Sequence, residues 1–237
     1  MRTSVITLLL LVTMLAIPPV TRAGTQVFLA PSQFTFATPS GTFNWSATSI
    51  GGRFGPSLGP LEFGTMLSYA PVNSLSFMGS PLSGYSGQMF AGEIGPRFAL
   101  GFGPIGVGAS AGYGGFVLNA RGPAASDAVL LSSLGFRLGV DARLTVAPTL
   151  SVRAGWTALT GLSTRADFSV SAPVAVVAQH AGSGSGSEFS IGVSFAPLPL
   201  VAAYAEYRSG TFFTGWSGGG STSSSYSGYV LGVQVRF

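Results

Sequence analysis

A strict alternation of apolar and polar residues over Ser133–Val146 constrains this chain more than any other feature. Every second residue from Leu134 onward is apolar, while the residues between are Ser, Gly, Thr or charged. A period of two residues indicates a β-strand with two different faces. The segment is longer than most strands of soluble proteins. It also exceeds the ~9–11 residues that a tilted strand needs to cross a bilayer.

The same alternation recurs along most of the chain. Its apolar positions are rich in Phe and Leu, and its polar positions hold mainly Gly, Ser and isolated charges. This pattern favours a barrel that is apolar outside and polar inside. Such a sheet must close, because hydrocarbon offers no hydrogen-bond partners to a free edge. The further segments are Leu61–Tyr69, Phe90–Phe102, Ile105–Val117, Leu150–Ala158, Glu188–Phe195, Val201–Arg208 and Tyr229–Phe237.

Composition excludes several other classes of protein. A mean hydropathy of +0.50 with 46% hydrophobic residues excludes disorder, and zero Cys excludes disulfide and thiolate–metal proteins. Gly, Pro, Ser or Arg interrupts the apolar stretches beyond residue 23 before they reach the length of a spanning helix. The sequence has no basic tract that would bind nucleic acid. A G-x-G-x-x-G match at 101–106 precedes another alternating segment rather than a helix, so we expect no cofactor.

The first residues have the pattern of a secretory signal peptide. Arg2 precedes an apolar run over 5–17, two prolines end this run, and Ala23 offers a cleavage site. We therefore expect residues 1–23 to be removed and residues 24–237 to form one domain.

The predicted fold is an all-β, antiparallel, up-and-down transmembrane β-barrel of ten strands. Eight of these strands lie between Leu61 and Phe237. Residues 34–37 and 42–48 supply one more hairpin, with Phe43, Trp45 and Ala47 facing outward. In this register Arg53 faces lipid unless a bulge intervenes. The alternative is an eight-stranded barrel in which residues 24–59 form an extension or a plug.

Short and long connections alternate along the predicted strands. Tight turns are expected at 103–104, 147–149 and 196–200, and long loops at 70–88, 120–131, 163–187 and 209–227. Short periplasmic turns and long extracellular loops are typical of outer-membrane barrels. The Gly/Ser tracts at 181–187 and 217–228 are expected to be flexible surface loops.

Charged residues on the polar faces are predicted to line the lumen. Five acidic and six basic groups suggest ion pairs that plug the barrel, and the alternative is a narrow pore whose charges select ions. The turns place Arg153 opposite Arg143 and diagonal to Asp141, and Arg208 opposite Glu188. The predicted set is Glu62, Glu93, Arg97, Arg137, Asp141, Arg143, Arg153, Glu188, Glu206, Arg208 and Arg236.

His180 is the single histidine, and it lies in a Gly/Ser-rich segment with Asp167 and Glu188 as the nearest acids in sequence. A general base needs an orienting partner, so we expect a solvated loop residue. We predict no catalytic, cofactor-binding or metal-binding residue.

The last segment carries a family resemblance. Tyr229, Leu231, Val233, Val235 and Phe237 alternate up to a final Phe, which resembles the terminal strand of bacterial outer-membrane β-barrels. The body is similar to small barrels of the opacity type and to the OmpA transmembrane domain. This resemblance implies location in the bacterial outer membrane, contact with its lipid and recognition by the barrel-assembly machinery.

The expected function is a structural or surface-interaction role of a monomer whose surface ligand is unknown. A small porin-like channel is the alternative, and a lipid A-modifying or proteolytic barrel enzyme is the third candidate.

Overall fold

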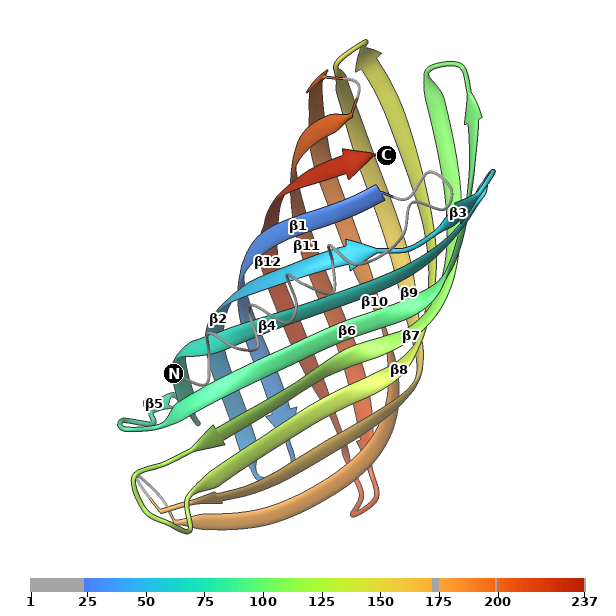
Figure 1. Cartoon of the computed structure of the whole chain (residues 1–237). Coiled ribbons are helices and arrows are strands. Elements are labelled where there is room, and N and C mark those ends of the chain that lie inside the picture. The colour runs from blue at the N-terminus through green and yellow to red at the C-terminus, as the bar shows by residue number, and fades with distance from the viewer. Residues whose placement is uncertain (1–23, 172–174, 199, 237) are drawn as a thin grey trace.

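The computed structural model describes residues 24–171, 175–198 and 200–236, so the expected signal peptide 1–23 and Phe237 lie outside it. Ten long antiparallel strands form one closed ring (Figure 1). Their bounds are β1 (Gly24–Thr38), β2 (Gly41–Phe54), β4 (Leu61–Phe77), β6 (Ser86–Phe102), β7 (Ile105–Arg121), β8 (Ala128–Ala147), β9 (Leu150–Val170), β10 (Val176–Leu198), β11 (Val201–Trp216) and β12 (Ser221–Arg236). Two-residue strands β3 (Ser57–Leu58) and β5 (Ser80–Pro81) lie outside the ring.

The N-terminal hairpin closes the barrel. β1 pairs with β12 from Gly24↔Arg236 onward and with β2 across the Pro39–Ser40 turn, while β2 pairs with β4. The ten-stranded prediction is therefore confirmed, and residues 24–54 are wall rather than a plug. Among the described residues there is no helix long and apolar enough to cross a membrane.

The two ends of the barrel are named here by their connections. At the terminal end lie the start of β1, the end of β12, the turns at 55–60, 103–104 and 148–149, the end of β10 and the start of β11. At the loop end lie the connections at 39–40, 78–85, 122–127 and 217–220, the end of β9 and the start of β10. The expected long loops are wrong, because strands β4 and β6–β12 continue through most of those residues.

An apolar belt covers the outer surface nearer the terminal end. Side chains of alternate residues point outward and are about half exposed, as on β10 with Phe189, Ile191, Val193 and Phe195. Toward the loop end the outward positions of the same strand become Ser187, Ser185 and Ser183. Apolar side chains suit contact with lipid, whereas Ser hydroxyl groups suit contact with water. The belt therefore marks the membrane, and the Ser-bearing wall extends beyond it.

Aromatic residues mark the boundary between the belt and this polar wall. Several are paired across neighbouring strands: Tyr69 with Phe90, Tyr113 with Phe136 and Tyr207 with Tyr229, at ring-centroid distances of 5.2, 5.4 and 5.3 Å. Amphipathic rings favour the level of lipid headgroups, and aromatic girdles flank the apolar band of outer-membrane barrels.

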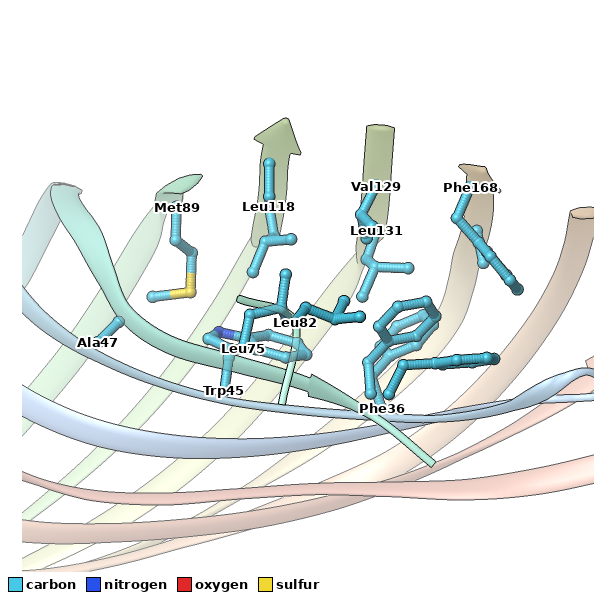
Figure 2. Close-up of a cluster of buried hydrophobic side chains, with 14 of the residues drawn as sticks. Phe36, Trp45, Ala47, Leu75, Leu82, Met89, Leu118, Val129, Leu131 and Phe168 are labelled. Carbon is cyan, nitrogen blue, oxygen red and sulfur yellow. The ribbon is translucent and has the colours of Figure 1, made fainter. Parts of the chain in front are cut away.

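The prediction for Phe43, Trp45 and Ala47 is wrong: all three point into the barrel and are almost fully buried. They belong to a cluster of apolar side chains inside the loop end, which we call the loop-end core (Figure 2). Its residues are Phe36, Phe43, Trp45, Ala47, Ala70, Leu75, Phe77, Leu82, Met89, Leu118, Ala120, Val129, Leu131, Leu159, Leu162, Ala166, Phe168, Val170, Phe212 and Trp216.

The physical reason for this error is a reversal of polarity along each strand. Near the terminal end the outer face meets lipid and is apolar, whereas beyond the belt the outer face meets water and the inner face is apolar. Arg53 shares the strand face of Phe43 and Trp45, because alternate residues of β2 point the same way. It therefore faces the lumen, where it lines a cavity. The rule that apolar residues face outward therefore holds for one half of the barrel.

Bulges also move residues between the two faces. On β9, Arg153 and Thr157 face inward at odd positions, but Leu162 and Ala166 face inward at even positions. The pairing of β8 with β9 shifts between Leu134 and Phe136, and Gly161 opposite this shift has a φ of 57°, which Gly adopts readily. A one-residue slip exchanges the faces of a strand.

Candidate functional site: the barrel lumen

Ion pairs fill the lumen at the level of the apolar belt. Arg97 contacts Glu62 at 3.3 Å and Asp141 at 2.8 Å, whereas Arg137 contacts Glu93 at 3.1 Å and Glu188 at 2.8 Å. These side chains come from β4, β6, β8 and β10, so each pair joins two different strands that are adjacent or one strand apart in the ring. Pairing offsets the desolvation of each charge.

The turn between β8 and β9 sets the next contacts. Arg143 lies opposite Arg153 in the ladder, and Arg153 reaches Asp141 at 3.3 Å, as the sequence predicts. Arg143 donates from Nε to Ser151 Oγ at 3.0 Å. Arg143 and Arg153 carry like charges directly opposite each other, and each side chain contacts a different partner.

The predicted pairing of Arg208 opposite Glu188 is wrong. Glu188 lies opposite Gly210, and Arg208 lies opposite Ser190. Pairing continues past a one-residue register shift to Leu198↔Val201 instead of ending at a five-residue loop, and β11 is therefore displaced by two residues from the expected register. Arg208 instead forms an ion pair with Glu206 on its own strand, and Glu188 accepts a hydrogen bond from Tyr226.

The structure thus places ten of the predicted lumen charges on the inner face of the barrel. We call these ten, together with Arg53, the charged layer. The remaining predicted charge, Arg236, ends β12 opposite Gly24, and its side chain lies outside the described residues. Tyr229, Leu231 and Val233 face outward on β12 and are about half exposed. Val235 pairs with Thr25 and Val201.

Two connected cavities occupy the lumen. The first has a volume of about 350 Å³, reaches the terminal end at Gly24 and Gln234, and is lined by the charged layer. The second, of about 150 Å³, lies farther in and is walled largely by apolar side chains, including Phe28, Met66 and Val230. Both cavities are lined by Arg53 together with Gln26, Glu93, Arg137, Glu188, Tyr204 and Arg208, so they meet at this group of residues.

The loop-end core lies on the other side of the inner cavity. Its rings pack in offset and edge-to-face arrangements, including Phe36 against Phe212 at 6.1 Å and Phe43 against Phe168 at 4.9 Å. Phe36, Phe43 and Leu118 have 1%, 0% and 0% of their surface exposed. The core therefore places close-packed hydrocarbon between the inner cavity and the loop end.

His180 is not a loop residue. It lies on β10 within the polar wall region, with its ring directed toward Trp216 and Phe168 at centroid distances of 5.8 and 6.2 Å. Its Nε2 lies 2.8 Å from Ser40 Oγ. Asp167 lies opposite the adjacent Gln179 and pairs with Arg165, and Glu188 is held by Arg137. Neither acid that the sequence suggested orients the imidazole.

The described residues contain no group of three His, Asp or Glu side chains that could hold a metal ion. The Gly/Ser tract at 181–187 is part of β10, and residues 221–228 are part of β12, so both are paired wall rather than flexible loop. The 101–106 glycine pattern forms the β6–β7 turn, with Phe102 paired to Ile105 as predicted.

No family model matches the chain, and no curated protein matches its sequence. Among solved structures, the outer membrane protease OmpT of Escherichia coli superposes with a TM-score of 0.55 at 9% identity, covering 91% of this chain and 97% of that one. The chain has the fold of bacterial outer-membrane β-barrels.

Two further outer-membrane barrels are similar at lower scores. Neisserial surface protein A has a TM-score of 0.44 at 12% identity, covering 91% of this chain and 97% of that one. The toluene transporter TbuX of Ralstonia pickettii has a TM-score of 0.41 at 10% identity, covering 92% and 90%. The fold rests on the likeness to OmpT, which at 9% identity shows the fold alone.

Sequence reasoning missed the loop-end core and the inner cavity. A signal was present: Phe34, Phe36, Phe43 and Trp45 alternate with Gln, Thr, Asn and Ser, which are poor lipid-facing residues. An outer face rich in hydroxyl and amide groups indicates water rather than lipid outside, and so places the aromatic residues inside.

Proposed function

We propose that this protein is a sealed, non-enzymatic, monomeric barrel of the bacterial outer membrane, with a structural or surface-interaction role. The observation that supports this most is the loop-end core, whose close-packed apolar side chains lie between the inner cavity and the loop end. The ion pairs of the charged layer add a second obstruction, because Arg97 and Arg137 each join side chains of different strands inside the lumen.

A planar-bilayer conductance measurement tests the seal. The wild-type protein is expected to give no stable current steps. Shortening Phe36 and Phe212 together to Ala removes two neighbouring rings of the core and is expected to produce openings. The matched control shortens Phe98 and Phe189, which face outward on the belt, and should stay silent. Steady wild-type current would overturn the proposal.

The loop end faces the cell exterior in this proposal. Its wall extends beyond the belt, and its outward face carries Ser and Thr, which suits contact with water or a surface partner. The chain has no Cys, so single cysteines report orientation directly. Ser225→Cys in the polar wall should react with an impermeant maleimide on intact cells. Thr149→Cys in a terminal-end turn should not, and the reverse pattern would contradict this orientation.

A channel is the second candidate function, and the cavity of about 350 Å³ open to the terminal end favours it. Such a channel needs the loop-end core to move aside. The same bilayer recording separates the two functions, since a channel would show steps whose ion preference changes with Arg97→Gln.

Our proposal of a non-enzymatic role rests on the surroundings of His180. The imidazole has a hydroxyl neighbour, Ser40, but the described residues offer it no carboxylate within contact distance. A base without an orienting acid is a poor catalyst. His180→Ala should leave the lipid A mass spectrum of the host unchanged, and an altered spectrum would contradict the proposed non-enzymatic role.

The outward alternation of β12 suits recognition by the barrel-assembly machinery. Leu231→Asp and Val233→Asp would place charge on this face and should reduce the amount of folded barrel in cells. The control Gln234→Asp changes the neighbouring inward position. Equal folding of all three would contradict a role of this face in assembly.

A further inference from the structure

Arg53 differs from the other arginines whose side chains the structure describes inside the belt region. Arg97, Arg137, Arg153 and Arg208 each form an ion pair, and Arg143 donates to Ser151. Arg53 is half-buried in the lumen and has no ion pair or hydrogen bond to a described residue. A guanidinium held away from bulk water requires a counter-charge.

The acids around Arg53 are already engaged. The inner cavity is lined by three arginines and two glutamates, namely Arg53, Arg137, Arg208, Glu93 and Glu188. Arg137 holds both glutamates, and Arg208 is held by Glu206. The charged layer as a whole has six arginines and five acids, so one positive charge is in excess there, and Arg53 lies where the polar cavity meets the apolar one.

The inner cavity has a definite size. Its volume is about 150 Å³, close to that of a protein cavity that holds one benzene molecule. Phe28, Phe34 and Tyr226 supply ring surfaces to its wall, and Met66 supplies a thioether. Aromatic rings and Met sulfur both pack well against a ring.

We propose that the inner cavity binds a small aromatic carboxylate that enters from the terminal end. The carboxylate accepts two hydrogen bonds from the guanidinium of Arg53, whose fork matches a carboxylate in geometry. The ring occupies the apolar pocket beside Phe28 and Met66. The outer cavity of about 350 Å³ provides the entry path, and the loop-end core forms the closed far wall.

Binding of 4-fluorobenzoate to the folded protein in lipid nanodiscs, followed by fluorine NMR, tests this site. The wild type should bind it above the level of empty nanodiscs. Arg53→Gln should weaken binding at least about tenfold, because it removes a charge-assisted pair, and Arg53→Lys should recover part of the loss. Ala91→Leu, which fills the inner cavity, should weaken binding to a similar degree.

The matched control is Arg143→Gln, which removes the same charge from the outer cavity and leaves the inner one intact. It should bind within about twofold of the wild type. No binding by the wild type, or equal losses in Arg53→Gln and Arg143→Gln, would overturn the proposal. Equally tight binding of fluorobenzene would overturn the role of Arg53, and equally tight binding of butyrate would overturn the aromatic class. A heat-shift gel establishes that each variant is folded.

Discussion

Phe34 and Trp45 stack inside the barrel, with ring centroids 4.9 Å apart and ring planes 5° from parallel. They face each other across the β1–β2 hairpin. Both rings thus point inward, whereas the aromatic residues of the belt face lipid, and they join the apolar packing at the loop end. The barrel therefore has the polarity of a membrane protein along one part of its length and that of a water-soluble barrel along the rest.

The boundary between these parts can be tested on a single strand. Ile191 and Ser185 both face outward on β10, one in the apolar belt and the other in the polar wall. Ile191→Arg should lower the free energy of unfolding by about 2–4 kcal/mol, because it places a charge in hydrocarbon. Ser185→Arg should change it by less than ~0.5 kcal/mol. Urea unfolding in lipid vesicles measures both, and equal losses would contradict the boundary.

The loop-end core should contribute to stability as the core of a soluble protein does. Leu131 has 0% of its surface exposed, so Leu131→Ala should cost about 2–5 kcal/mol through lost burial and the cavity left behind. Leu138 on the same strand faces outward, and Leu138→Ala should cost much less in the same unfolding experiment. A smaller loss for Leu131→Ala than for Leu138→Ala would argue against a packed core.

Arg137 should be the arginine whose loss disturbs the charged layer most. Like Arg97 it holds two acids, here Glu93 and Glu188, but its side chain is 15% exposed against 26% for Arg97. Arg137→Met leaves two carboxylates unpaired and should destabilise the barrel by about 3–5 kcal/mol. Adding Glu93→Gln and Glu188→Gln should recover most of that loss. A triple variant no more stable than the single one would show that the ion pairs are not the source of the effect.

Tyr85, in the connection before β6, gives a pH-dependent prediction outside the membrane. Burial, followed by the nearby charge of Asp127, raises the pKa of Tyr85 to about 12 from its ordinary value near 10. The folded protein then keeps a proton that the unfolded chain loses, so this contribution to stability is present below pH 10 and is lost as pH rises toward 12. The difference in ultraviolet absorbance between wild type and Tyr85→Phe should titrate with a midpoint near 12, and a midpoint near 10 would contradict it.

Sequence reasoning predicts the fold class, the ten strands and most lumen charges for one physical reason. Along Ser133–Val146 and the similar segments, lipid forces one whole face to be free of charge, so a period of two is easily read. The contact between Arg153 and Asp141 follows from that period and a short turn.

The features that the sequence did not predict depend on where the membrane ends, on bulges and on register shifts. The two-residue alternation of apolar and polar residues carries no information about these. The polarity of Phe43 and Trp45 depends on where the membrane ends, and the faces of Leu162 and Phe168 depend on the bulge near Gly161. The place of Arg208 depends on a register shift beside a turn. The site at Arg53 requires all three-dimensional neighbours to be known, because its defining property is that the acids around it are already paired.

The most direct test of the account compares two adjacent residues on β9. The side chain of Arg165 faces outward and is 62% exposed, while Ala166 faces the loop-end core and is 0% exposed. Cysteines at these positions in the folded, cysteine-free protein should differ sharply in their rate of reaction with a water-soluble maleimide. Arg165→Cys should react rapidly, and Ala166→Cys should react only after unfolding. Equal, rapid reaction at both positions, as in an open loop, would contradict the loop-end core and with it the sealed barrel.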